Sequence, residues 1–211
     1  MSAASKPEWA EAVIRVGDGR GFIVAAGDER LIITAGHCLP GLPPYHGASC
    51  LYERTFDALL GPIGEEPKVS AECLFADPIA DLAILGMPDS QNLAYEALVE
   101  DRATLSIISL PTPAKWPIPD LQRRGWLLSL DGEWFSCDVQ QIGRALWIEN
   151  AAQPIVGGMS GSPIIAEDGR AIGVACMSSS SDNNRGGGPN PYLADVLPAW
   201  AFWRMVAARR H

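Results

Sequence analysis

Short apolar runs separated by turn-forming residues recur along the whole sequence. In the first half, clusters of Gly, Asp and Pro separate runs that cover residues 12–16, 22–26, 31–34, 68–75 and 82–85. Apolar runs of this length, bounded by such clusters, predict strands rather than helices. The segment Gly27-Asp28-Glu29-Arg30 lies between two of the runs and predicts a hairpin loop. The polar, acidic stretch near 88–103 is expected to connect two halves of the chain.

The second half of the sequence continues this strand-like pattern. Its apolar runs cover residues 105–110, 125–130, 133–139, 145–148, 163–166 and 171–177. Asp131-Gly132 lies between two of these runs, and it is the strongest hairpin signal in the chain. The glycine-rich stretch 186–189 follows four serines and is expected to belong to a flexible loop.

The segment that begins at Pro198 predicts one C-terminal helix, because proline suits the first turn of a helix. Ala199, Phe202, Trp203 and Val206 recur at helical spacing and are expected to form its apolar face.

The composition excludes several classes of protein. The chain has 211 residues, of which 47% are hydrophobic, and this excludes intrinsic disorder. Its net charge of −9 argues against nucleic acid or an anionic membrane as a partner, because binding phosphates requires clustered Lys and Arg. No apolar run approaches the roughly 18 residues that a transmembrane helix needs. The first residues also lack the basic and apolar regions of a secretory signal.

The cysteines indicate a reducing compartment. There are five of them, widely spaced and without a CxxC pair: Cys38, Cys50, Cys73, Cys137 and Cys176. The odd number and the missing signal predict free thiols and a cytoplasmic location. With three histidines in the chain, a structural zinc site is not expected, and no metal or organic cofactor is implied.

Three segments carry residues suited to nucleophilic catalysis. They are Thr34-Ala35-Gly36-His37-Cys38, Asp81-Leu82-Ala83-Ile84-Leu85 and Gly157-Gly158-Met159-Ser160-Gly161-Ser162-Pro163. Taken singly, each has an ordinary structural interpretation: a polar strand end, a turn-forming Asp and a Gly/Ser loop. Together they supply a serine, an imidazole that accepts its proton, and a carboxylate that orients the imidazole. Glycines beside the serine leave backbone N–H groups open to a developing oxyanion.

These motifs together resemble those of the trypsin-like (chymotrypsin-fold) serine peptidases. TAGHC resembles the family's histidine motif, and DLAIL its aspartate motif in the form common among bacterial and HtrA-like members. GGMSGSPI resembles its serine motif, with Ser162 in place of the second glycine. The order His, Asp, Ser along the chain is also that of the family. The resemblance is to a member without a PDZ domain, and it runs from about residue 12 to the terminal helix.

The resemblance implies an all-β fold with two six-stranded antiparallel β-barrels of the chymotrypsin type and a C-terminal α-helix. Residues 1–11 would be an N-terminal extension, and residues 12–100 would form the first barrel. Residues 101–197 would form the second barrel, and residues 198–211 the helix. The active site would then lie in the cleft between the barrels.

The same resemblance assigns the catalytic roles. Ser160 would be the nucleophile, His37 the general base and Asp81 the carboxylate that orients His37. Asp77 competes with Asp81, but it precedes a proline and suits a turn, whereas Asp81 stands directly before an apolar run. The N–H groups of Gly158 and Ser160 would form the oxyanion hole.

Substrate contacts are implied at two places. Segment 173–178 resembles the strand that pairs with the substrate backbone, so Cys176, Met177 and Ser178 would bind substrate. Cys176 also stands where many relatives carry a serine that hydrogen-bonds the catalytic carboxylate, and a thiol is a weaker donor. Pro154, six residues before Ser160, would set the floor of the pocket for the residue on the acyl side of the cut.

The implied activity is that of a serine endopeptidase acting through an acyl-enzyme on a protein or peptide substrate. The pattern of an α/β-hydrolase is absent, since the serine lacks a second glycine two residues later and the histidine precedes it. Two alternatives stay open. One is a catalytically silent binding module that keeps the fold, and the other is an enzyme that depends on a regulatory protein partner.

Overall fold

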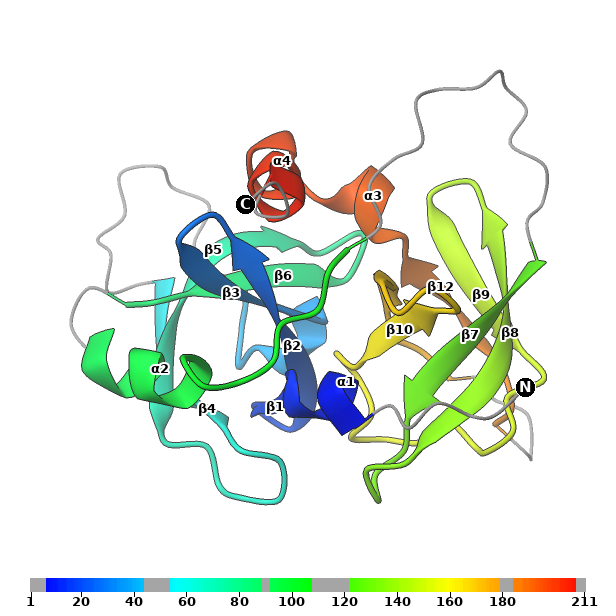
Figure 1. Cartoon of the computed structure of the whole chain (residues 1–211), viewed down its shortest axis with the longest axis horizontal. Helices are drawn as coiled ribbons and strands as arrows, with labels where there is room; N and C mark the ends of the chain where they lie inside the picture. Colours follow the sequence, from blue (N-terminus) through cyan, green and yellow to red (C-terminus); the bar gives the residue numbers. More distant parts are fainter. Residues whose placement is uncertain (1–6, 44–53, 89–91, 108–121, 179–183, 208–211) are drawn as a thin grey trace.

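Two antiparallel β units lie side by side in the computed structural model and are flanked by helices (Figure 1). The structure describes residues 7–43, 54–88, 92–107, 122–178 and 184–207. The expected all-β architecture with two six-stranded units is therefore confirmed.

The first unit is a closed barrel with the strand order β1-β2-β3-β6-β5-β4. Its strands are β1 (Val13–Val16), β2 (Gly19–Ala26), β3 (Glu29–Thr34), β4 (Thr55–Gly61), β5 (Val69–Asp77) and β6 (Leu82–Gly86). The hairpin expected at 27–30 joins β2 and β3, although Glu29 and Arg30 already belong to β3. Phe22, Ile32 and Leu85 are completely buried in its core. Each such side chain contributes about 1.5–3 kcal/mol of hydrophobic stabilisation.

The second unit is a six-stranded sheet with the order β11-β10-β7-β8-β9-β12. Its strands are β7 (Gln122–Leu128), β8 (Trp134–Ile142), β9 (Ala145–Glu149), β10 (Pro163–Ala166), β11 (Ala171–Val174) and β12 (Gly187–Pro191). A single bridge between Gly173 and Tyr192 brings the two edges together, so this barrel is nearly closed. The hairpin expected at Asp131-Gly132 joins β7 and β8. Alternating burial along β8 directs Phe135, Cys137 and Val139 into the second core.

The sequence pattern did not predict two of the observed strands, β4 and β12, and one strand that it did predict is wrong. β4 contains exposed Asp57 and Ala58, and β12 lies in the stretch 186–189 that was expected to be a flexible loop. The expected strand 105–110 instead makes isolated bridges within its described part, and its residues 108–110 lie outside the described residues. Leu105 bridges to β2 and Ile107 to β11, so this segment links the two barrels.

Four α-helices occur in the described residues: α1 (Pro7–Glu11), α2 (Asn92–Val99), α3 (Leu193–Val196) and α4 (Ala199–Ala207). The C-terminal helix is confirmed as α4, and its expected apolar face is confirmed at Phe202 and Val206 but wrong at Ala199 and Trp203. Ala199 and Trp203 are exposed, whereas Ala201, Phe202 and Met205 are buried where α4 packs on β2. Helical spacing alone allows either face, and packing on β2 selects the one that is buried. Among the described residues, no helix is long and apolar enough to cross a membrane.

The four cysteines that the structure describes are free and buried, and burial raises the pKa of each. The pKa reaches about 11 for Cys73 and about 12 for Cys137. Because the thiolate is the reactive form, we expect these thiols to resist iodoacetamide at pH 8 in the folded protein and to react once urea unfolds it. Peptide mapping by mass spectrometry measures both states. Rapid native labelling of Cys137 would contradict the expectation.

Candidate active site

His37 and Asp81 are brought together by the pairing of two neighbouring strands. His37 lies in a short 3-10 helix, η1 (Gly36–Cys38), directly after β3. Asp81 directly precedes β6, and Thr34 near the end of β3 pairs with Ala83 near the start of β6. The antiparallel register therefore places the two motifs at the same end of the first barrel.

Two hydrogen bonds join these residues. His37 Nδ1 lies 2.7 Å from Asp81 Oδ2, and the backbone N–H of His37 donates to Asp81 Oδ1 at 2.9 Å. Asp81 has a φ of +55°, an unusual value for a residue with a side chain. Asp77, the competing acid, instead accepts the N–H groups of Ile79 and Ala80 with one carboxylate oxygen. It is thus the turn residue that its position before Pro78 predicted.

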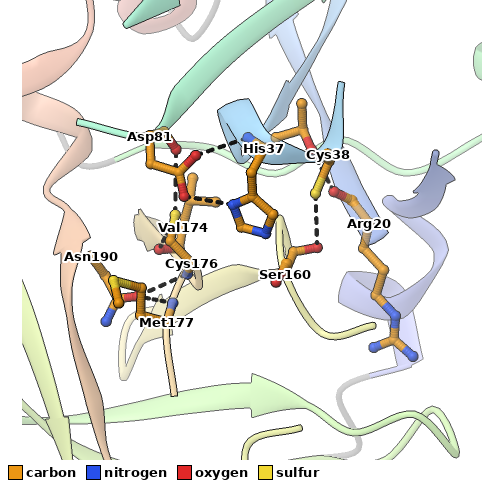
Figure 2. A network of polar contacts seen from close by, with 10 residues as sticks. Arg20, His37, Cys38, Asp81, Ser160, Val174, Cys176, Met177 and Asn190 are labelled. Carbon is orange, nitrogen blue, oxygen red and sulfur yellow. Dashed lines mark hydrogen bonds and ion pairs between the residues drawn. The ribbon is translucent and has the colours of Figure 1, made fainter. Parts of the chain in front are cut away.

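Ser160 reaches the same place from the second barrel. Its carbonyl oxygen accepts the backbone N–H of Arg20 at 2.7 Å and the thiol of Cys38 at 3.6 Å. In Figure 2 the imidazole of His37 lies between the carboxylate of Asp81 and Ser160. No hydrogen bond joins the hydroxyl of Ser160 to His37, although the structure describes both residues. The three motifs of the sequence therefore meet at the junction of the barrels.

The turn before Ser160 is tight and contains a glycine with a positive φ. The N–H of Met159 donates to the carbonyl of Val156 at 3.2 Å, and Gly158 between them has a φ of +86°. A positive φ at this position is typical of a type II turn, which favours glycine there. Within the described residues, the N–H groups of Gly158 and Ser160 donate to no protein acceptor. They are therefore available to a ligand.

The segment after β11 runs along the other side of the site. The predicted strand 171–177 ends at Val174, and the backbone beyond it is held partly by a side chain that the sequence analysis missed. Asn190 of β12 is almost completely buried, and its Oδ1 accepts the N–H groups of Cys176 at 2.8 Å and Met177 at 3.3 Å. Its Nδ2 donates to two carbonyls, so all its polar atoms are bonded. An Asn inside an apparent glycine-rich loop gave no signal of this role.

Cys176 contacts Asp81, the carboxylate beside His37. Its thiol donates to the backbone carbonyl of Asp81 at 3.4 Å. Burial and the nearby charge of Asp81 raise the pKa of Cys176, so the thiol stays protonated and can act as the donor. The contact holds the backbone of Asp81 where its φ is positive.

A small pocket of about 70 Å³ opens beside Ser160. Its walls are formed by the turn before Ser160 and by the segment after β11, namely Ile155, Val156, Gly157, Met159, Ser160, Ala175, Cys176, Met177 and Ser178. No acidic side chain of the described residues lines it. Cys176, Met177 and Ser178 line this pocket, whereas Pro154 is exposed and does not line it. Asp182 lies outside the described residues.

Comparisons with known proteins show the family and the fold of this chain. A family model described as the trypsin-like peptidase domain matches residues 19–174. The solved structure of Rv3671c from M. tuberculosis H37Rv, a serine-to-alanine mutant in an inactive form, is 15% identical with a TM-score of 0.51, and the match covers 96% of this chain and 90% of that chain. A human pathogenic astrovirus serine protease is 16% identical with a TM-score of 0.53, covering 90% and 94%.

No curated protein matches the sequence significantly. At these low identities the two solved structures bear on the fold alone, and they confirm that the β units have the chymotrypsin-like arrangement.

Proposed function

Because the chain belongs to the family of trypsin-like peptidases, we propose that it is a serine endopeptidase with Ser160 as its nucleophile. The observation that carries this proposal is the order Asp81, His37, Ser160 across the junction of the barrels, with His37 Nδ1 2.7 Å from Asp81 Oδ2. The substrate would be a protein or peptide, which is the class that peptidases of this family cleave.

The contacts of His37 suit a general base. With its proton on Nδ1 donated to Asp81, the imidazole keeps a lone pair on Nε2 for the proton of the serine hydroxyl. The side chain of His37 is 48% exposed, so a substrate can reach it. Attack by Ser160 would give an acyl-enzyme, which water activated by His37 would then hydrolyse.

The turn at 156–159 suits an oxyanion hole. The N–H groups of Gly158 and Ser160 would donate to the oxygen of the tetrahedral intermediate, where charge develops. A single donor of this kind is worth roughly 10²–10³-fold in rate. The substrate backbone would pair with the segment of Cys176, Met177 and Ser178. Asn190 holds this segment by accepting two of its backbone N–H groups.

A serine-reactive fluorophosphonate tests the proposal. We expect the wild-type protein to be labelled at Ser160, and both Ser160→Ala and His37→Ala to remain unlabelled. Tandem mass spectrometry of the labelled peptide identifies the modified residue. If the folded wild-type protein takes up no label, the isolated chain is not an active peptidase, and the silent binding module and the partner-dependent enzyme are the two alternatives that are left.

The pocket predicts a preference for small or medium apolar residues, such as Ala, Val, Leu or Met, on the acyl side of the cleaved bond. Its lining supplies no carboxylate for a substrate cation, and burying an unpaired charge costs several kcal/mol. Selectivity among the apolar residues should be moderate, because one methylene is worth about 1–3 kcal/mol. Profiling of cleavage sites on a mixed peptide library measures this preference. A dominant preference for Arg or Lys would refute it, and Asp182→Asn would then test whether that residue supplies the charge.

Several finer expectations stay predictions. They are the HtrA-like branch, a bacterial source, a cytoplasmic location, the role of Pro154 and dependence on a regulatory partner.

A further inference from the structure

Arg20 is a buried arginine that is not paired with any carboxylate of the described residues. It lies on β2, its side chain is almost completely buried, and it forms no ion pair with any of the described residues. Burial lowers the pKa of its guanidinium, and nothing else perturbs it. Burying a charge is costly unless it is compensated, so its remaining contacts must supply that compensation.

The hydrogen bonds of its guanidinium and of its backbone N–H cross from the first barrel to the second, whereas its carbonyl accepts the hydroxyl of Thr34 within the first barrel. Nη1 of Arg20 donates to the carbonyls of Leu128 at 3.0 Å and Ser129 at 2.9 Å, at the end of β7. The backbone N–H of the same residue donates to the carbonyl of Ser160 at 2.7 Å. Figure 2 shows the guanidinium extending away from Ser160, so one residue contacts the second barrel at two separate points.

The hairpin that Arg20 contacts also lies beside the turn at 156–159, which we call the oxyanion turn. Ser129 begins the tight turn that ends at Gly132, and its carbonyl also accepts the N–H of Gly132 at 3.2 Å. Leu130 within this turn packs beside Gly158, with its Cδ2 3.4 Å from the point that a Cβ on Gly158 would occupy. The guanidinium, the hairpin and the oxyanion turn therefore form one continuous series of contacts.

From this series we infer that Arg20 is a positioning residue with two roles. Its guanidinium holds the β7–β8 hairpin so that Leu130 supports the oxyanion turn, and the backbone N–H of Arg20 holds the backbone of Ser160. It does not touch the substrate. The inference rests on the proposed function, because the oxyanion turn matters for rate only if Ser160 attacks a carbonyl.

Arg15 supplies a matched control. It pairs directly with Arg20 across β1 and β2, and its guanidinium also donates to two backbone carbonyls, those of Gly17 at 3.0 Å and Glu65 at 2.8 Å. Both acceptors belong to the first barrel, since they flank its strands. Arg15→Met and Arg20→Met thus each remove an arginine that binds carbonyls, but only the latter breaks contacts between the barrels.

The test measures kcat per active site, with sites counted by titration with the fluorophosphonate so that unfolded protein does not contribute. We expect Arg20→Met to lower kcat roughly 10- to 100-fold with KM changed less than about threefold, because small displacements of oxyanion donors act on the transition state. Arg20→Lys keeps a cationic donor and should recover part of the loss, while Arg15→Met should keep the wild-type kcat. A purely structural role would lower the number of titrated sites and leave kcat per site unchanged, and that result would overturn the inference.

Hydrogen–deuterium exchange separates this inference from the proposed function. If the wild-type protein fails to react with the phosphonate, the proposed function fails, yet exchange still reports on the contacts. Arg20→Met should accelerate exchange in segments 126–134 and 155–161 relative to wild type and to Arg15→Met. Unchanged exchange in 155–161 would overturn the inference whatever the activity. If Arg20→Met does not fold, the same comparison is made with Arg20→Lys.

Discussion

Ser160→Ala is expected to lower kcat roughly 10⁴-fold or more while the protein stays folded, because it removes the nucleophile. His37→Ala should have an effect of similar size. The double variant should be no worse than either single one, since residues that act as a unit do not have additive effects. Initial rates on a peptide substrate, with urea unfolding as the check on folding, measure all three variants.

Ser162→Ala is the matched control for this experiment, since it removes a second serine hydroxyl two residues away. Ser162 is completely buried, and its Oγ has no hydrogen-bond partner among the described residues. Its removal should leave kcat unchanged, and stability should stay equal or rise by about 1 kcal/mol, because an unsatisfied buried hydroxyl is itself destabilising. Near wild-type cleavage by Ser160→Ala would refute the mechanism.

Gly161→Ala is expected to have the largest effect on stability, of about 4 kcal/mol or more. A Cβ at this position would stand 1.7 Å from the carbonyl oxygen of Arg20 and 2.7 Å from Thr34 Oγ1. The φ of Gly161 is +83°, which adds strain for any residue with a side chain. Only a glycine at position 161 allows the backbone directly after Ser160 to approach the first barrel this closely. Urea unfolding at equilibrium measures the loss.

Gly157→Ala is the control for that substitution. It lies in the same loop, but a Cβ there would meet nothing within 4 Å, and its φ is outside the positive range. Its unfolding midpoint should therefore stay close to that of the wild type. A Gly161→Ala protein as stable as Gly157→Ala would show that the two barrels can separate locally to admit the methyl group.

Local signals in the sequence were sufficient for most strands and for the three motifs. The alternation of apolar and polar residues predicted β8, and the Asp-Gly pair predicted its hairpin with β7. Both signals lie within a few residues of the chain. Such signals failed for β12, whose glycines and prolines resemble a loop. That strand exists because β9 offers it a partner edge, and a partner distant in the sequence has no local signature.

The same division holds at the candidate site. The sequence by itself determined which residue types are present, their order, and the choice of Asp81 over Asp77, because a turn before proline is a local property. Only the tertiary structure decided that Asn190 holds the segment beside the pocket and that Arg20 spans the two barrels. It also decided that Phe202 rather than Trp203 faces the core. These outcomes depend on which surfaces meet when two barrels and a helix pack together, and no pattern within one segment records its partner.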